Sequence, residues 1–173
     1  FPLWERTKLA NEAGGKVFLS IHVNANKNSK ASGFETYLLR PGKTDAAIAV
    51  AEMENAVIKL ENNSEQYDKL SAEQLILATM AQSSFMQQSE TLADLTQSEF
   101  DRKLVGQNRG VKQAGFIVLI GASMPNVLIE LGFISNKYDA KRLKTAAYRQ
   151  KAAEAIFEAL MKYRTRHEKL LSP

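Results

Sequence analysis

His22 and Glu130 are the two residues whose type and position most plainly indicate chemistry. The chain has only two histidines, and His22 comes at the end of an apolar run, residues 17–23, directly before a polar stretch. In α/β enzymes such a strand end faces the crevice that holds catalytic groups. His22 therefore fits a metal ligand, a general acid or base, or a hydrogen-bonded core residue, whereas His167 lies in a basic stretch typical of a surface.

Glu130 is unusual because it is a carboxylate inside the apolar run NVLIELGF, with Ile129 and Leu131 as its neighbours. Burying an ionised carboxylate without a partner costs several kcal/mol. Glu130 must therefore be paired, protonated, associated with a metal, or placed at a strand end that faces a cleft. In a cleft it would suit a general base that acts on a water molecule.

The elements that must position these two residues follow from hydrophobic periodicity. Short β-branched and aromatic runs predict strands, which we expect over residues 17–23, 34–39, 116–120 and 126–131. Apolar residues at three- and four-residue steps predict helices, which we expect over residues 1–13, 44–60, 139–170 and, with a break, 71–104.

The interleaving of these strands and helices predicts an α/β fold. We expect a mostly parallel, twisted sheet covered by helices on both faces, together with a helical insertion. The first strand, residues 17–23, is apolar on both faces and is predicted to be a buried central strand. A joint role in catalysis requires that His22 and Glu130 converge at the carboxyl edge of the sheet, close enough to share one water at a divalent ion.

The composition restricts the class of protein. The chain has 173 residues, of which 45% are hydrophobic and 24% charged, as expected for one globular domain. The absence of cysteine excludes disulfides, thiolate metal sites and cysteine nucleophiles. No run of about 20 apolar residues predicts a transmembrane segment, and no signal peptide is visible.

Charge is unevenly distributed along the chain. Residues 44–101 contain eleven acidic residues against two basic ones, whereas residues 137–173 contain ten basic residues against four acidic ones. The basic stretch lacks the interleaved aromatic residues of a nucleic-acid-binding surface, so we do not expect a nucleic-acid partner.

Three blocks of sequence resemble a known family. They are Arg6, Ala10 and Asn11 in the first helix, then SIHVNA at residues 20–25 followed by GFETYLL, and finally MPNVLIELGFISN at residues 124–136. In this order the blocks are similar to the amidase_3 type of N-acetylmuramoyl-L-alanine amidases, which are zinc hydrolases. The similarity covers nearly the whole chain apart from its acidic middle.

The resemblance implies a site and a reaction. It implies that His22 is a zinc ligand and that Glu130 is the general base for hydrolysis of the amide between N-acetylmuramic acid and L-alanine in peptidoglycan. It also implies action in the periplasm or cell envelope, in cell-wall turnover and daughter-cell separation. Asn24 and Asn136 are candidates for lining the substrate groove. The alternative interpretation is that both are turn residues.

The family's other two zinc ligands, a histidine in a glycine-rich motif and a glutamate, precede the matching region. Catalytic zinc normally needs three protein ligands. We therefore expect residues 1–173 to be a single amidase catalytic domain that lacks its N-terminal portion and is inactive alone. The alternative is a non-catalytic peptidoglycan-binding or regulatory module that retains the amidase fold.

The acidic middle of the chain has a counterpart in the family members that act in cell separation. These resemble it in carrying a helical insertion that lies over the zinc site until an activator protein displaces it. Residues 61–104 are the predicted regulatory insertion here. Glu61 or Glu65 is a candidate for the carboxylate that occupies the open metal position, and the alternative is that both lie on a solvated helix face.

Overall fold

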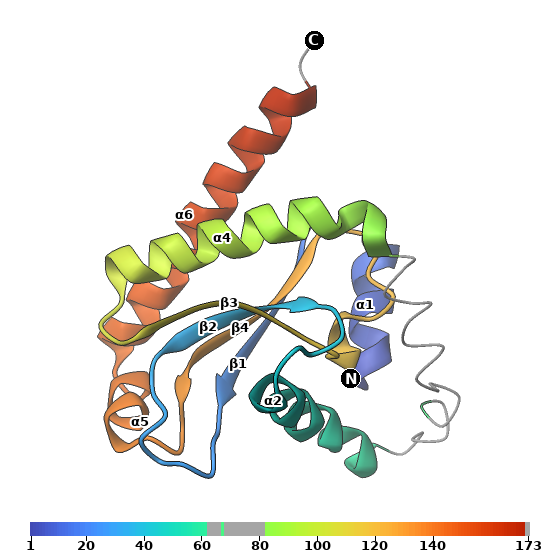
Figure 1. The fold of residues 1–173 in the computed structure, drawn as a ribbon. Coiled ribbons are helices and arrows are strands. Elements are labelled where there is room, and N and C mark those ends of the chain that lie inside the picture. The colour runs from blue at the N-terminus through green and yellow to red at the C-terminus, as the bar shows by residue number, and fades with distance from the viewer. Residues whose placement is uncertain (62–66, 68–81, 172–173) are drawn as a thin grey trace. The chain divides into compact units, whose positions relative to one another are not determined.

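The computed structural model describes residues 1–61, 67 and 82–171. Its centre is a four-stranded sheet of strand order β1-β4-β2-β3, flanked by helices (Figure 1). The strands are β1 (Phe18–Asn24), β2 (Phe34–Leu39), β3 (Asn108–Ala114) and β4 (Asn126–Phe133). The predicted α/β fold is confirmed.

β1 and β4 are parallel neighbours. The backbone N–H of Phe18 donates to Pro125 just before β4, and the N–H of Ile134 just after β4 donates to Asn24. The two strands therefore start together and end together, as in a parallel pair.

β2 and β3 pair in the same way. The N–H of Phe34 donates to Gln107 before β3, and the N–H of Arg40 after β2 donates to Ala114 at the end of β3. This pair is also parallel.

The chain divides into two compact units, and each strand passes from one unit to the other. Unit 1 comprises residues 1–20, 37–89 and 112–128, and unit 2 comprises residues 21–36, 90–111 and 129–173. β1 and β4 begin in unit 1, whereas β2 and β3 begin in unit 2. β4 and β2 therefore run in opposite directions, so the sheet is mixed and two of its three pairings are parallel.

The position of β1 differs from the prediction. β1 lies at an edge of the four-stranded sheet, and Ile21 and Val23 are 54% and 40% exposed. The prediction of a buried central strand for residues 17–23 is therefore wrong within the described part of the chain. An apolar run favours burial on both faces, but it does not encode how many strands flank it.

Unit 1 contains the helices α1 (Leu3–Glu12) and α2 (Asp45–Asn55) and the 3-10 turns η1 (Ala56–Leu60) and η4 (Ile117–Leu119). Its core gathers around aromatic residues of β2 and of the segment before η4. Tyr37 and Phe116 meet edge to face with ring centroids 5.0 Å apart. This packing covers the part of the sheet that belongs to unit 1.

The strand predicted over residues 116–120 is wrong, because most of this run forms the turn η4. Phe116 and Leu119 are fully buried, so the run is apolar for a reason other than strand pairing. The Asn55 amide supplies the backbone partners: it donates to Gly115 and accepts from the N–H of Ile117. A side chain distant in sequence thus satisfies backbone groups that a sheet would otherwise pair.

β3 was not predicted from the sequence. Its sequence, NRGVKQA, is polar and contains a glycine, and Ala114 is its one fully buried residue. β3 is the other edge of the sheet, where a strand needs no continuous apolar run.

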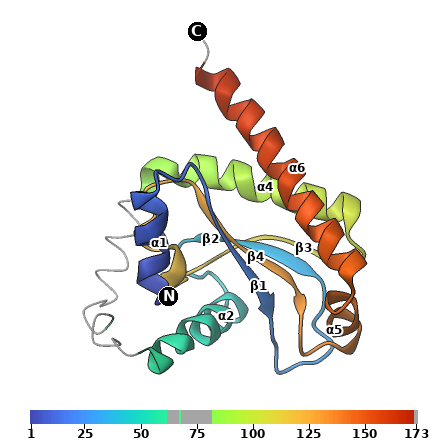
Figure 2. The same cartoon turned by 180° about the vertical axis from the view of Figure 1, so that it is seen from behind.

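Unit 2 contains most of α4 (Met86–Lys103) and all of α5 (Lys137–Leu143) and α6 (Ala146–Leu171). Figure 2 shows α4, α5 and α6 from behind. The single helix predicted over residues 139–170 is two helices, because the Thr145 hydroxyl accepts the N–H of Tyr148 and starts a new one. No described helix is long and apolar enough to cross a membrane.

α4 contributes core residues to unit 2. Leu92, Ala93 and Phe100 are fully buried, and Phe100 packs edge to face on Phe34 of β2. This helix makes up much of the predicted insertion, residues 61–104. Of the rest, residues 62–66 and 68–81 lie outside the described residues, and a regulatory role stays a prediction.

Candidate metal centre

β1 and β4 place His22 and Glu130 beside each other in unit 2. Each is the fifth residue of its strand, and the strands are parallel neighbours. A ligand atom of the His22 imidazole and a carboxylate oxygen of Glu130 lie within 4.8 Å of each other. The prediction that the two side chains converge is confirmed.

The environment and chemistry of the pair suit a metal ion. Glu130 is fully buried, whereas His22 is half-buried. Imidazole nitrogen and carboxylate oxygen are both zinc ligands, with bonds of about 2.0–2.2 Å. A separation within 4.8 Å would let His22 bind an ion while Glu130 reaches a water molecule on that ion.

Glu54, near the end of α2, was not singled out from the sequence. It is a half-buried carboxylate in unit 1 and a further residue of a type that holds metal ions. A glutamate in an amphipathic helix is usually predicted to lie on the solvent-exposed face of the helix. No feature of the local sequence therefore distinguishes Glu54 from the acidic residues near it.

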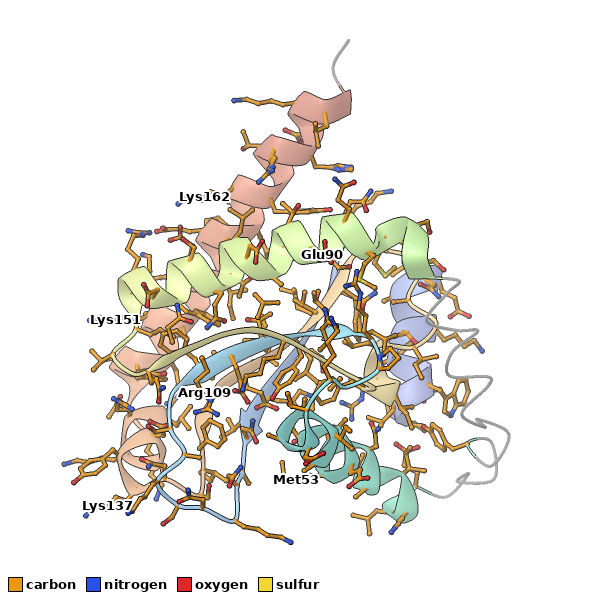
Figure 3. All side chains as sticks on the ribbon, in the orientation of Figure 1. Met53, Glu90, Arg109, Lys137, Lys151 and Lys162 are labelled. Atoms are coloured by element: carbon orange, nitrogen blue, oxygen red, sulfur yellow. The ribbon has the colours of Figure 1, made fainter. Side chains whose placement is uncertain are left out.

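Two buried polar residues, Asn24 and Glu35, and the half-buried Arg109 connect β1 with β2 and β3. The Asn24 amide donates to Glu35 Oε1 at 2.8 Å, and Arg109 Nε donates to Glu35 Oε2 at 2.7 Å. The Arg109 guanidinium lies 5.1 Å from the centre of the Phe133 ring, and Figure 3 labels Arg109 on β3. We refer to Asn24, Glu35 and Arg109 as the polar bridge.

The polar bridge fixes the strand that carries His22. Asn24 and His22 are two residues apart, so their side chains leave the same face of β1. Asn24 is fully buried and bonded to Glu35, and its predicted place in a substrate groove stays a prediction. Glu35 was not identified from the sequence, although a carboxylate inside the strand FETYLL is the same kind of signal as Glu130.

Asn136 begins α5. Its side-chain oxygen accepts the N–H groups of Tyr138 and Asp139, and its amide donates to the Ser29 carbonyl. Its interpretation as a turn residue is confirmed, because it caps the helix. Its role in a substrate groove stays a prediction.

The Glu61 carboxylate has two partners within unit 1. Oε1 accepts the Leu3 N–H at 2.9 Å, and Oε2 accepts the Tyr67 hydroxyl at 2.6 Å. Burial, together with this hydrogen bond, raises the pKa of Tyr67 to about 12. Glu61 thus ties the chain after α2 to the start of α1. Glu65 lies outside the described residues, and the metal-blocking role predicted for either residue stays a prediction.

Comparison with known sequences gives a family match. Residues 1–162 match the family model described as N-acetylmuramoyl-L-alanine amidase. The chain is 32% identical over 164 residues to the N-acetylmuramoyl-L-alanine amidase AmiA of Escherichia coli, covering 94% of this chain and 56% of that protein. It is 33% identical over 163 residues to the amidase LytC of Bacillus subtilis, covering 94% of this chain and 24% of LytC.

Solved structures share the fold. The catalytic domain of CwlV from Paenibacillus polymyxa matches with a TM-score of 0.65 at 22% identity, over 95% of this chain and 66% of that one. CwlD from Clostridioides difficile, solved in complex with the GerS lipoprotein, matches with a TM-score of 0.63 at 25% identity, over 94% and 61%. The chain spans about half of AmiA and less than two thirds of CwlD.

Proposed function

The chain belongs to the N-acetylmuramoyl-L-alanine amidase family, and on that premise we propose that it forms part of a zinc-dependent hydrolase of peptidoglycan. The bond cut is the amide between N-acetylmuramic acid and the L-alanine of the peptide stem. The observation that carries the proposal is the approach of His22 and Glu130 within 4.8 Å in neighbouring strands.

His22 and Glu130 have different roles in this proposal. His22 binds the ion through its imidazole, which is a neutral nitrogen donor. Glu130 takes a proton from the attacking water and passes it to the alanine nitrogen as the amide breaks. When bound, zinc polarises the carbonyl and lowers the pKa of a coordinated water to about 7.

The ion needs more ligands than His22. Zinc in a catalytic site normally has three protein ligands and one open position, so we expect the complete enzyme to supply the others.

The experiment compares two variants of the complete enzyme. Glu130→Gln should abolish the release of stem peptides from peptidoglycan and leave the zinc content intact, because it removes a base and not a ligand. His22→Ala should lower the zinc content as well as activity. His167→Ala is the matched control and should change neither.

Two results would contradict the proposal. Full zinc content in His22→Ala would mean that His22 is not a ligand. Unchanged turnover in Glu130→Gln would mean that Glu130 is not the base. If the complete protein binds peptidoglycan but never releases stem peptides, the non-catalytic module is the better description.

We also propose that the complete enzyme works in the periplasm or cell envelope and is autoinhibited through residues 61–104 until an activator protein displaces them. The acidity of residues 44–101 supports this, because carboxylates are attracted to a cationic centre. Glu61→Gln in the complete enzyme should raise basal hydrolysis if Glu61 blocks the ion. Unchanged basal hydrolysis would mean that Glu61 does not block the ion and only makes its contacts to Leu3 and Tyr67.

A further inference from the structure

A polar pocket of about 730 Å³ lies in unit 2, lined by the loops that follow β1 and β4 and by the turn before β3. Its lining includes Lys30, Lys137, Arg142, Ser32 and Ser135. Figure 3 labels Lys137, which begins α5. We call it the loop pocket; no residue proposed above as a metal ligand or base lines it.

Hydrogen bonds hold the walls of the loop pocket together. The N–H of Asn26 donates to the Ser135 hydroxyl at 3.0 Å, and the Asn136 amide donates to the Ser29 carbonyl at 2.8 Å. These bonds join the loop after β1 to the loop after β4. A pocket whose walls are already ordered loses little entropy when a ligand enters.

Asp139, a buried carboxylate that does not itself line the loop pocket, binds Arg142 of its lining. Its Oδ2 accepts the backbone N–H groups of Gly33 and Phe133 at 2.8 and 3.0 Å, and its Oδ1 accepts from Arg142. Asp139 is 2% exposed, so its charge is compensated by these hydrogen bonds within the protein. Among the cationic residues that line the pocket, Arg142 is therefore already paired with a carboxylate.

The remaining charge of the loop pocket is positive. Lys30 and Lys137 are exposed, and none of the described residues that line the pocket is acidic. Lys137 lies 5.0 Å from the centre of the Tyr138 ring, which helps to hold its ammonium group beside the pocket. Two ammonium groups with serine hydroxyls and an asparagine amide suit a carboxylate on a polar ligand.

The loop pocket lies a short way along the strands from the candidate metal centre. Glu130 is three residues before Phe133, the last residue of β4, which is about 10 Å at the rise of a strand. An extended peptide of three or four residues has a similar length. A stem peptide whose first amide lies at His22 and Glu130 would bring its later residues to the pocket.

We propose that the loop pocket binds a carboxylate of the peptide stem, with Lys30 and Lys137 as the residues that select it. The inference rests on the proposed function, because the amide at the metal centre sets the direction in which the stem extends. The pocket selects the charge state of the stem and takes no part in the bond cleavage.

The test uses the complete enzyme and two soluble muramyl peptides, one with free stem carboxylates and one with these carboxylates amidated. The wild type should have a KM about tenfold lower for the free acid. Lys30→Gln with Lys137→Gln should remove this preference by raising the KM for the free acid, with kcat unchanged. Lys144→Gln, an exposed lysine outside the pocket, is the control and should keep the preference.

Binding separates this inference from the proposed function. Calorimetry with the same two peptides and the Glu130→Gln variant reports the preference without turnover. A preference in this variant together with a wild-type enzyme that releases no stem peptides would keep the pocket and reject the amidase proposal, whereas an active wild type without the preference would reject the pocket alone.

Two outcomes would overturn the assignment. Equal affinity of the wild type for the free and amidated peptides would show that the pocket does not select a carboxylate. Competition by inorganic phosphate, without discrimination between the two peptides, would assign the pocket to a phosphate group instead.

Discussion

At the scale of single residues, the polar bridge is the arrangement most sensitive to substitution. The Glu35 side chain is 1% exposed and that of Arg109 is 26% exposed, so this ion pair is largely shielded from water. Removing one partner of such a pair leaves the other charge uncompensated, which costs more than losing a surface ion pair.

Glu35→Ala is expected to lower the free energy of unfolding by about 2–3 kcal/mol, since it deprives Arg109 and the Asn24 amide of their acceptor. Urea denaturation measures the loss. Glu12→Ala removes the exposed pair with Lys8 and serves as the control, with an expected change below about 0.5 kcal/mol. Equal effects of the two substitutions would mean that the bridge is no more important than a surface contact.

Gly33 lies at a position where both the backbone conformation and a close neighbour favour glycine. Its φ is +102°, and an added Cβ would lie 2.1 Å from the Gln107 carbonyl oxygen. Gly14 also has a positive φ, of +64°, but nothing lies within 4 Å of its added Cβ. A comparison of substitutions at these two glycines therefore distinguishes backbone strain from a steric clash with a neighbouring residue.

Gly33→Ala is expected to destabilise the chain by more than about 2 kcal/mol, whereas Gly14→Ala should cost only about 1 kcal/mol, the cost of the left-handed conformation. Thermal unfolding followed by circular dichroism compares them. A similar loss in both variants would show that the contact with Gln107 relaxes without cost.

At the scale of elements, α4 and α6 are joined through one buried carboxylate. The Glu99 side chain is 2% exposed and accepts hydrogen bonds from Lys162 and Arg102. Burial alone would raise the pKa of Glu99, but the hydrogen bonds from Lys162 and Arg102 outweigh burial and lower it. The ionised form of Glu99 is therefore the form that stabilises the helix pair.

Glu99→Gln is expected to lower stability at pH 7 by about 1–2 kcal/mol, a range reduced because both cations are half-exposed. Because the pKa of Glu99 is lowered by folding, its contribution is complete above its ordinary value of about 4.3 and disappears as pH falls below it. Unfolding free energies measured from pH 7 to pH 3 should converge for the two proteins. A difference that stays constant over this range would contradict an ionic contribution.

At the scale of the whole molecule, part of the predicted insertion, residues 61–104, belongs to the hydrophobic core and cannot be removed without losing buried contacts. α4 supplies Leu92, Ala93 and Phe100 to the core of unit 2, all fully buried. Deleting three such side chains removes several kcal/mol of burial free energy, which is comparable with the stability of a whole domain.

Removing residues 61–104 is therefore expected to abolish the cooperative unfolding transition, so this deletion is a poor test of autoinhibition. A thermal melt of the deleted chain measures the effect, with Glu61→Gln as a variant that should still unfold cooperatively. A cooperative melt of the deleted chain would show that α4 is dispensable and that the insertion extends to residue 104.

The sequence alone determined the parts of this protein that local patterns encode. Residues 34–39 form β2, residues 45–55 form α2 and residues 126–133 form β4, because periodicity and chain-breaking residues act over a few neighbours. His22 and Glu130 were identifiable because a polar side chain within an apolar strand is costly to bury unless it is paired or functional, and their convergence was what the functional interpretation required.

Only the tertiary structure decided which segments become neighbours. It placed β1 at an edge, made β4 and β2 antiparallel, gave Phe116 a turn in place of a strand, and paired Asn24 with Glu35. Each of these depends on a partner far away in the sequence. A local pattern records that a residue is to be buried or satisfied, but the choice of partner is a property of the folded chain, where packing and hydrogen bonding across strands are settled together.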